Sequence, residues 1–178
     1  MFKIRQAELN DVKSIVNIWV QGWLYAYKNI LSKEFLEKKT NQEAIDKKTK
    51  KFSEAINSCK NSDSIFLVMT DKDKVIGYVE GGIPESKESN EDKELYNLYI
   101  DTEYIGKGIG KQLFKAFAEE IKKQGAKTFG LMCFTDNKSM DFYKKMGGKI
   151  TITRPSSEKW ESKLGSFLAF NVDEVLSK

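Results

Sequence analysis

Residues 104–111 of this 178-residue chain read YIGKGIGK, with a glycine at every second position and two lysines among them. A strand-like segment, ELYNLYI (94–100), precedes this stretch, and an amphipathic, helix-like segment (110–124) follows it. The free N–H groups of a first helical turn form an anion site, and glycine lets a ligand approach the backbone closely. The stretch therefore predicts either a phosphate cradle over 106–111 or a tight turn that needs glycine for geometry alone.

Two familiar phosphate loops do not fit this stretch. A Walker A loop reads GxxxxGK[ST], but here Lys111 is followed by Gln112, and Ile105 stands where the first glycine belongs. The dinucleotide fingerprint GxGxxG fails because Leu113 occupies the position of its last glycine. Nucleoside-triphosphate and dinucleotide binding are thus disfavoured.

Composition excludes several classes of chemistry. The chain has no histidine, which removes Ser-His-Asp and Cys-His catalysis and histidine-ligated metals. Its two cysteines, Cys59 and Cys133, form no CxxC pair, so we expect no metal site and no disulfide framework. The 30 basic residues are balanced by 26 acidic ones. A nucleic-acid module rests only on the pI of 8.8 and a lysine-rich segment, 33–60, so we expect no nucleic-acid partner.

The chain is expected to be a cytoplasmic protein of one domain, residues 1–178. Its length suits a single domain. The first residues, MFKIRQAELND, lack the features of a signal peptide. No apolar run approaches the ~20 residues of a membrane span, so no membrane association is expected.

Periodicity predicts alternating strands and helices in a mixed α/β sheet. The pair 64–70 and 75–83, joined by DKDK, has the form of an antiparallel hairpin, and the polar segment 84–94 that follows it reads as a solvated loop. In chain order we expect strands at 2–5, 64–70, 75–83, 94–100, 127–134, 149–154 and 165–170, and helices that begin at Asn10 or Asp11 and at Ser32 and that span 34–60, 110–124 and 135–147.

Two blocks of this sequence resemble the GNAT superfamily of N-acetyltransferases. Residues 105–110, IGKGIG, are similar to its acetyl-coenzyme A loop, [Q/R]xxGx[G/A], with Ile105 in place of Gln or Arg. Residues 137–147, NKSMDFYKKMG, are similar to its Nxx[AS]xxFYxxxG helix, with Gly148 where an aromatic residue is usual. The resemblance implies a single-domain α/β (α+β) fold with a mixed, mostly antiparallel central sheet flanked by helices.

The resemblance also implies direct transfer of an acetyl group from acetyl-CoA to an amine, without a metal. The pyrophosphate of coenzyme A would lie on the glycine stretch, its pantetheine arm along the preceding strand, and Asn137 against the arm or the nucleotide. The cofactor-binding residues implied are Leu98, Tyr99, Ile100, Ile105, Gly106, Lys107, Gly108, Ile109, Gly110, Lys111, Asn137 and Tyr143.

Three residues are candidates for catalysis. Spacing alone favours a core tyrosine at Tyr143, but in the resemblance it occupies the position of the family's general acid. An attacking alkylamine must lose a proton, and Glu94 and Glu80 are the acids nearest the predicted cleft. We prefer Glu94, which matches a position often acidic in the family. A solvated acid at a strand end is the plain alternative for either residue.

The acceptor is a small-molecule or peptide amine, and sequence does not narrow it further. Trp23 and Tyr27 would wall the acceptor pocket, yet Trp19 and Trp23 at i, i+4 are also typical of a simple core helix. Family members are often dimers, so a homodimer is one expectation. A non-catalytic sensor of coenzyme A or acetyl-CoA with the same fold is the alternative function.

Overall fold

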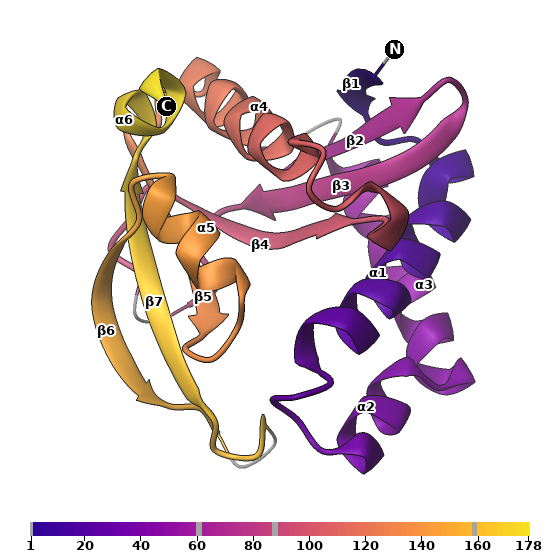
Figure 1. Cartoon of the computed structure of the whole chain (residues 1–178). Coiled ribbons are helices and arrows are strands. Elements are labelled where there is room, and N and C mark those ends of the chain that lie inside the picture. Colours follow the sequence, from indigo (N-terminus) through magenta and orange to yellow (C-terminus); the bar gives the residue numbers. More distant parts are fainter. Residues whose placement is uncertain (1, 60–61, 87–88, 158–159) are drawn as a thin grey trace.

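The structure is a computed structural model that describes residues 2–59, 62–86, 89–157 and 160–178. Within these residues, seven strands form one sheet in the order β1-β2-β3-β4-β5-β7-β6, and helices cover both faces (Figure 1). The β4–β5 pair is parallel, and the other neighbouring pairs are antiparallel. The expected α/β (α+β) fold with a mostly antiparallel sheet is therefore confirmed.

The strands lie close to their expected positions. The hairpin of β2 and β3 is present, and the late pair β6 and β7 forms the opposite end of the sheet. The strands are β1 (Phe2–Gln6), β2 (Ile65–Asp71), β3 (Lys74–Gly82), β4 (Lys93–Ile100), β5 (Thr128–Phe134), β6 (Lys149–Pro155) and β7 (Leu164–Asn171).

The helices differ from expectation in three places. The segment expected to be one helix over 34–60 is two helices, because Asn41 accepts a hydrogen bond from the Ala44 N–H and starts a second one. Residues 135–138 do not join the last long helix, and a short helix after β7 was missed. The helices are η1 (Leu9–Asp11), α1 (Val12–Tyr27), α2 (Lys33–Thr40), α3 (Gln42–Ser58), η2 (Thr102–Tyr104), α4 (Ile109–Lys123), α5 (Ser139–Lys145) and α6 (Val172–Ser177).

Each face of the sheet has its own hydrophobic core. On one face the apolar side of α4 packs on β2 to β5 and β7, together with α5 and α6. On the other face α1 and α3 cover β2 and β3 around Phe52, Phe66 and Tyr78. We call these the α4 face and the α1 face. Among the described residues, no helix has both the length and the apolar character needed to cross a membrane.

Strand β4 pairs with β3 along most of its length but with β5 only at its start. It pairs with β5 only at Lys93 and Glu94, opposite Phe129 and Gly130. An irregularity then shifts its register with β3, so that Leu95 lies opposite Gly81 but Asn97 lies opposite Glu80. Such a bulge bends a strand. Residues 96–100 are all half-buried, although β4 is the central strand of the sheet. We call the gap between 95–100 and the end of β5 the opening.

Candidate active site at the opening between β4 and β5

The glycine turn, residues 105–110, joins β4 and η2 to α4 at one end of the opening. Gly106 and Gly108 have φ angles of +84° and +78°, which favour glycine, and an added Cβ at either position would meet no protein atom within 4 Å. The glycines therefore serve the backbone conformation, and the surface above them is open. Gly110 differs: its Cβ would lie 3.0 Å from Ile100 Cδ1, so it permits close packing of helix on strand.

The N-terminus of α4 has donors without a partner inside the helix. Its first intrahelical bond runs from the Gln112 N–H to the Gly108 carbonyl, 3.2 Å away, which leaves the amides of 108–111 outside the helical ladder. Gly108 provides no capping side chain, and the first turn contains no acidic residue. The positive end of the helix dipole thus faces the open surface of the glycine turn.

The two lysines of the turn are directed to different places. The Lys107 ammonium lies 4.4 Å from the centre of the Tyr104 ring, beside the turn. The Lys111 ammonium donates to the Lys178 carbonyl oxygen at 2.8 Å and so contacts the end of the chain. Ile105 is 41% exposed. A phosphate at this turn would meet backbone amides first, with Lys107 as the nearer side-chain cation.

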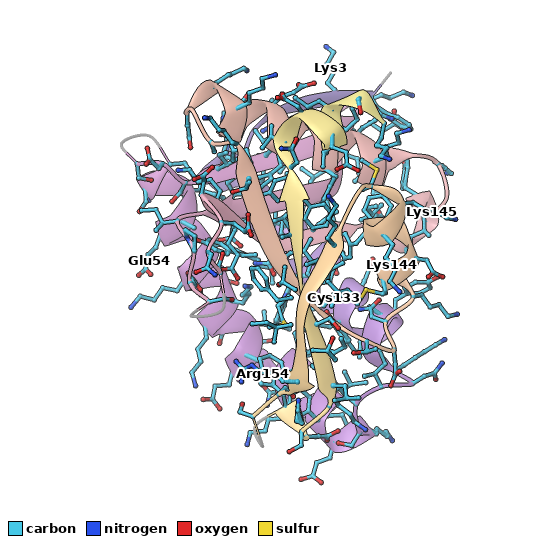
Figure 2. All side chains as sticks on the ribbon, turned by 90° about the vertical axis from the view of Figure 1, so that its left-hand side faces the viewer. Lys3, Glu54, Cys133, Lys144, Lys145 and Arg154 are labelled. Atoms are coloured by element: carbon cyan, nitrogen blue, oxygen red, sulfur yellow. The ribbon has the colours of Figure 1, made fainter. Side chains whose placement is uncertain are left out.

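Tyr143 lies on α5, at the α4 face of the opening. Its half-buried ring packs against Phe142, Phe114 and Phe170, with centroids 5.3, 5.9 and 6.4 Å away. Burial raises the pKa of its hydroxyl well above the ordinary value, with smaller contributions from Cys133 and Tyr27. Lys144 and Lys145, which follow it, are exposed on the outer side of α5 (Figure 2). Tyr143 is thus a neutral hydrogen-bond donor at neutral pH.

Asn137 and Cys133 flank this position. The Asn137 side-chain oxygen accepts a hydrogen bond from the Ser139 N–H at 2.8 Å, directly before α5. A contact of Asn137 with the cofactor remains a prediction. Cys133 is buried, and desolvation raises the pKa of its thiol to about 12, so it is not a nucleophile at neutral pH.

The two candidate acids have different surroundings. The Glu94 carboxylate accepts three hydrogen bonds from the loop that precedes β4. The donors are the N–H groups of Glu85 (2.9 Å) and Ser86 (2.8 Å) and the Ser86 hydroxyl (2.7 Å). It also lies where β4 and β5 are still paired. Glu80, in contrast, accepts a hydrogen bond from Asn97 Nδ2 at 2.5 Å, at the bulge that begins the opening.

Glu80 titrates differently from an ordinary glutamate. It is only 7% exposed, and burial raises its pKa, against the opposing effects of Lys48, the Asn97 hydrogen bond and Lys51. Lys48 comes from α3, where its ammonium lies 4.2 Å from the centre of the Phe52 ring. Desolvation lowers the pKa of Lys48 to about 8, while Glu80 acts in the opposite direction. Glu80 is therefore a buried carboxylate with a cation nearby.

Glu80 also lines a cleft of about 270 Å³ between α3 and the strands. Among the described residues, Glu54 and Glu85 line the same cleft together with one basic residue, Lys51. We call this space the acidic cleft. The overall charge of the chain is positive, so the acidic cleft is a local feature that composition did not reveal.

Aromatic side chains cover the α1 face of the opening. Trp23 contacts Tyr27 (centroids 4.6 Å apart) and stacks on Trp160 (5.8 Å), and Tyr27 meets Phe134 of β5 edge-on (5.7 Å). The Trp23 indole N–H is buried and has no hydrogen-bond partner among the described residues. Trp160 lies between β6 and β7, where Ser32 donates to the neighbouring Glu161 through its N–H and hydroxyl. Sequence reasoning identified Trp23 and Tyr27 but missed Trp160.

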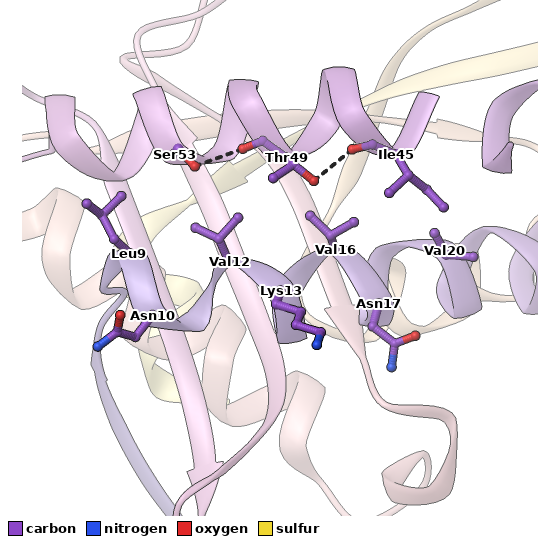
Figure 3. Close-up of a pocket in the computed structure, with 10 residues that line it drawn as sticks. All are labelled: Leu9, Asn10, Val12, Lys13, Val16, Asn17, Val20, Ile45, Thr49 and Ser53. Atoms are coloured by element: carbon purple, nitrogen blue, oxygen red, sulfur yellow. Dashed lines mark hydrogen bonds between the residues drawn. The ribbon is translucent and has the colours of Figure 1, made fainter. Parts of the chain in front are cut away.

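A second groove lies away from these residues, between α1 and α3 (Figure 3). Leu9, Val12 and Val16 point across it toward α3, and Lys13 points away. The hydroxyls of Thr49 and Ser53 donate to carbonyls of their own helix, at 2.8 and 2.9 Å. Its lining combines apolar side chains with amides, hydroxyls and Lys13, and among the described residues it contains no carboxylate that could accept a proton from an amine.

Comparison with known proteins gives consistent matches. Residues 24–148 match the sequence model of the acetyltransferase (GNAT) family. A spermidine N(1)-acetyltransferase of Thermoplasma acidophilum is 29% identical over 165 residues, which cover 92% of this chain and 98% of that protein. The crystal structure of the PaiA N-acetyltransferase from the same organism, in complex with coenzyme A, superposes with a TM-score of 0.77 at 25% identity, covering 96% and 99% of the two chains. YncA from Salmonella typhimurium, solved with acetyl-CoA, shares the fold (TM-score 0.71, 17% identity, 97% and 95% covered).

Proposed function

This chain belongs to the acetyltransferase (GNAT) family, and on that premise we propose that it transfers the acetyl group of acetyl-CoA directly to an amine of a small cationic, polyamine-like acceptor. The observation that carries the proposal is the opening between β4 and β5. It is bounded by the amide-rich glycine turn at one end, by Tyr143 on one face and by Glu80 on the other.

The glycine turn fits the pyrophosphate of coenzyme A. Four amides at the N-terminus of α4 lie outside the helical ladder, and the positive φ angles of Gly106 and Gly108 keep the surface above them free of side chains. Backbone amides and Lys107 would hold the phosphates here. The Ile105 side chain offers no polar group, so this chain relies on the backbone where relatives have Gln or Arg.

The free edge of β4 fits the pantetheine arm. Beyond Glu94 this edge has no β5 partner among the described residues, so the backbone groups of Leu98 to Ile100 that point toward β5 are available to the two amides of the arm. An arm lying along β4 would bring its thioester to the bulge at Asn97. Coenzyme A and acetyl-CoA in the complexes of the fold relatives support this cofactor.

Glu80 and Tyr143 would move the proton. The amine reaches the enzyme mostly protonated, because an alkylamine has a pKa near 10.4, and it must lose a proton to attack. Glu80 accepts this proton, for which its raised pKa suits it better than an ordinary carboxylate. The neutral amine forms the C–N bond, the C–S bond breaks, and Tyr143 gives the leaving sulfur a proton. As the amide forms, its nitrogen loses a second proton, which restores the Tyr143 hydroxyl, and the proton on Glu80 passes to solvent. The ammonium thus releases two protons, one of which is balanced by the proton on the thiol.

Glu94, the acid preferred from sequence, suits this role less well. Glu94 is only 5% exposed, and an incoming amine would have to displace the three hydrogen bonds that its carboxylate accepts from Glu85 and Ser86. We therefore assign the base to Glu80 and a loop-fixing role to Glu94.

The acidic cleft favours a cationic acceptor. Glu54 and Glu85 lie near Glu80 in a space wide enough for an alkyl chain, and carboxylates of this kind would hold the additional ammonium groups of a polyamine. The name of the Thermoplasma relative, a spermidine acetyltransferase, agrees with this class. The aromatic side chains of Trp23 and Trp160 would pack against the aliphatic segments of the acceptor.

The test is a thiol-release assay with acetyl-CoA and a panel of amines: spermidine, an aminoglycoside, an amino acid and a peptide with a free N-terminus. We expect turnover with spermidine and its absence in the Tyr143→Phe variant, with acetyl-CoA affinity unchanged. Turnover with another amine alone would reject the polyamine class. Binding of acetyl-CoA without turnover of any amine would favour a coenzyme A sensor.

A further inference from the structure

The glycine turn begins with a tight reversal of the chain at Ile105 and Gly106. The Lys107 N–H donates to the Tyr104 carbonyl oxygen at 3.4 Å. Ile105 has φ and ψ angles of −61° and 141°, and Gly106 has a φ of +84°. These angles match a type II β-turn, which needs a positive φ at its third residue. Because the first and fourth residues of such a turn lie close together, the turn brings Lys107 next to Tyr104.

The Tyr104 ring is held in place by contacts that do not involve Lys107. It packs against the core of the α4 face, and Phe2 of β1 meets it edge-on with centroids 6.3 Å apart. Its hydroxyl donates to Asp71 Oδ2 at 3.4 Å, at the end of β2. Its backbone is fixed as well, because the Tyr104 N–H donates to the Asp101 carbonyl oxygen at 2.8 Å. The ring therefore offers a fixed surface beside the turn.

Two ammonium groups lie over the Tyr104 ring, and their surroundings differ. The ammonium of Lys107 is 4.4 Å from the ring centre, and that of Lys74 is 5.2 Å away. Lys74 forms ion pairs with Asp101 (2.8 Å) and Glu103 (3.4 Å), which offset its charge. In the part of the chain that the structure describes, no carboxylate forms an ion pair with Lys107. Of the two charges, that of Lys107 is available to an anion.

We propose that Tyr104 is a positioning residue for coenzyme A: its ring holds the Lys107 ammonium beside the open amides of the glycine turn, where the ammonium binds the pyrophosphate. The pair supplies the side-chain contact with phosphate that Ile105, which has no polar group, does not make. Tyr104 acts through Lys107 and does not itself contact the cofactor. This inference rests on the proposed function, because it needs a phosphate at the glycine turn.

An aromatic partner suits this role better than a carboxylate does. A ring face attracts an ammonium but leaves its charge and its three N–H donors available to a ligand. A carboxylate would offset the charge and accept from the donors, as Asp101 and Glu103 do at Lys74. Lys107 is exposed, so without the ring its long side chain would sample many rotamers. Such preorganisation raises affinity without adding a contact to the ligand.

The test measures acetyl-CoA affinity by calorimetry in the intact chain, with the melting temperature of every variant. Lys107→Met should lower the affinity about tenfold, because it removes a charge-assisted contact with phosphate. Tyr104→Leu should lower it about threefold, the effect of an exposed cation–π contact. Tyr104→Phe keeps the ring and should bind acetyl-CoA as the unaltered protein does. The control is Lys123→Met, which removes a charge at the far end of α4, where Lys123 pairs with Glu120.

A double variant separates positioning of Lys107 from damage to the turn. If Tyr104 acts through Lys107, adding Tyr104→Leu to Lys107→Met should cause no further loss of affinity, whereas damage to the turn would add its own loss. Additive losses would overturn the inference, and so would an equal loss in Tyr104→Phe and Tyr104→Leu.

Lys107→Met decides the matter even if Tyr104→Leu does not fold, because Lys107 is exposed and its substitution leaves the fold intact. Full acetyl-CoA affinity in Lys107→Met would overturn the inference and leave the proposed function in place. Failure of the unaltered protein to bind acetyl-CoA would remove both.

Discussion

Asn97 donates a hydrogen bond to Glu80 across β3 and β4, from Nδ2 to Oε2 at 2.5 Å, directly beyond the bulge that turns β4 away from β5. The bulge sets the register, so it brings an amide and a carboxylate together where the strand edge becomes free. One irregularity in β4 thus creates the opening and positions the acid beside it.

Glu80 and Glu94 should have different functions, one in catalysis and the other in stability. Glu80→Gln removes the group proposed to accept the amine proton, and loss of a general base lowers rates by about 10²–10⁴-fold. Glu94→Gln should keep most of the turnover and instead lower stability by about 1–3 kcal/mol, because it weakens charge-assisted bonds to the 85–86 loop. Rates and denaturant unfolding of both variants decide this. The reverse pattern would return the base to Glu94.

The pH dependence of kcat/KM should change when the charge of Lys48 is removed. The base works as a carboxylate, so kcat/KM should rise with pH through the raised pKa of Glu80. The groups that act on Glu80 are Lys48 and Lys51 of α3, Glu85 and Asn97. Lys48 favours the carboxylate and is charged below about pH 8, so Lys48→Met should move the acid limb up by about one unit.

The control for this shift is Lys47→Met, at an exposed position of the same helix. It removes an equal charge that is not among the groups lining the cleft or acting on Glu80, and any titration of the amine itself is common to both variants. A Lys48→Met profile that coincides with the Lys47→Met profile would show that Lys48 does not influence the base.

Local signals in the sequence were sufficient to predict much of the fold. Ser32 caps α2 through its side chain, as expected, and the β2–β3 hairpin follows alternation and a turn signal. The break at Asn41 was missed because the lysine-rich segment has helix-forming residues on both sides of it. Gly106 and Gly108 stand out in the sequence, and in the structure both have positive φ angles; their contact with a phosphate remains a prediction.

The composition of the site was harder to predict because it depends on long-range register. The choice between Glu80 and Glu94 turns on a bulge and on which loop folds back on each carboxylate, and neither has a sequence signal. Trp160 reaches Trp23 from more than 130 residues away, through a connection with no recognisable motif. The break in β4–β5 pairing is equally invisible, because both strands read as ordinary apolar segments.

The glycine turn can be tested with a matched pair in one helix. Gly108 and Gly125 flank α4 with φ angles of +78° and +85°, and a Cβ on either meets no protein atom within 4 Å. Alanine at either position should therefore cost a similar 1–2 kcal/mol of stability. Only Gly108→Ala should also weaken acetyl-CoA binding, measured by calorimetry, because it alters the amides at the N-terminus. Equal affinities would argue against the phosphate site.

Trp160 should affect the acceptor and leave the cofactor alone. Trp160→Ala removes a ring that stacks on Trp23, and aromatic contacts of this kind are worth about 0.5–1.5 kcal/mol beyond the area they bury. We expect KM for the amine to rise about tenfold with acetyl-CoA affinity unchanged. Leu164→Ala, exposed in the same hairpin, is the control. An unchanged amine KM would assign Trp160 to packing alone.

Gly22→Ala tests whether the distance between α1 and β4 matters for catalysis. Helix propensity alone predicts a gain of about 1 kcal/mol, the effect that Ser14→Ala, exposed on the same helix, would show in part. The new methyl group would instead press on the Tyr99 ring, which Tyr78 supports from behind, and such overpacking costs about 1–3 kcal/mol. We therefore expect Gly22→Ala to lower the free energy of unfolding and, by displacing Tyr99 in the strand proposed to hold the pantetheine arm, to lower kcat as well. Urea unfolding and steady-state rates measure the two effects. A stabilised variant with full kcat would mean that the Tyr99 ring moves freely, and that its position does not matter for the reaction.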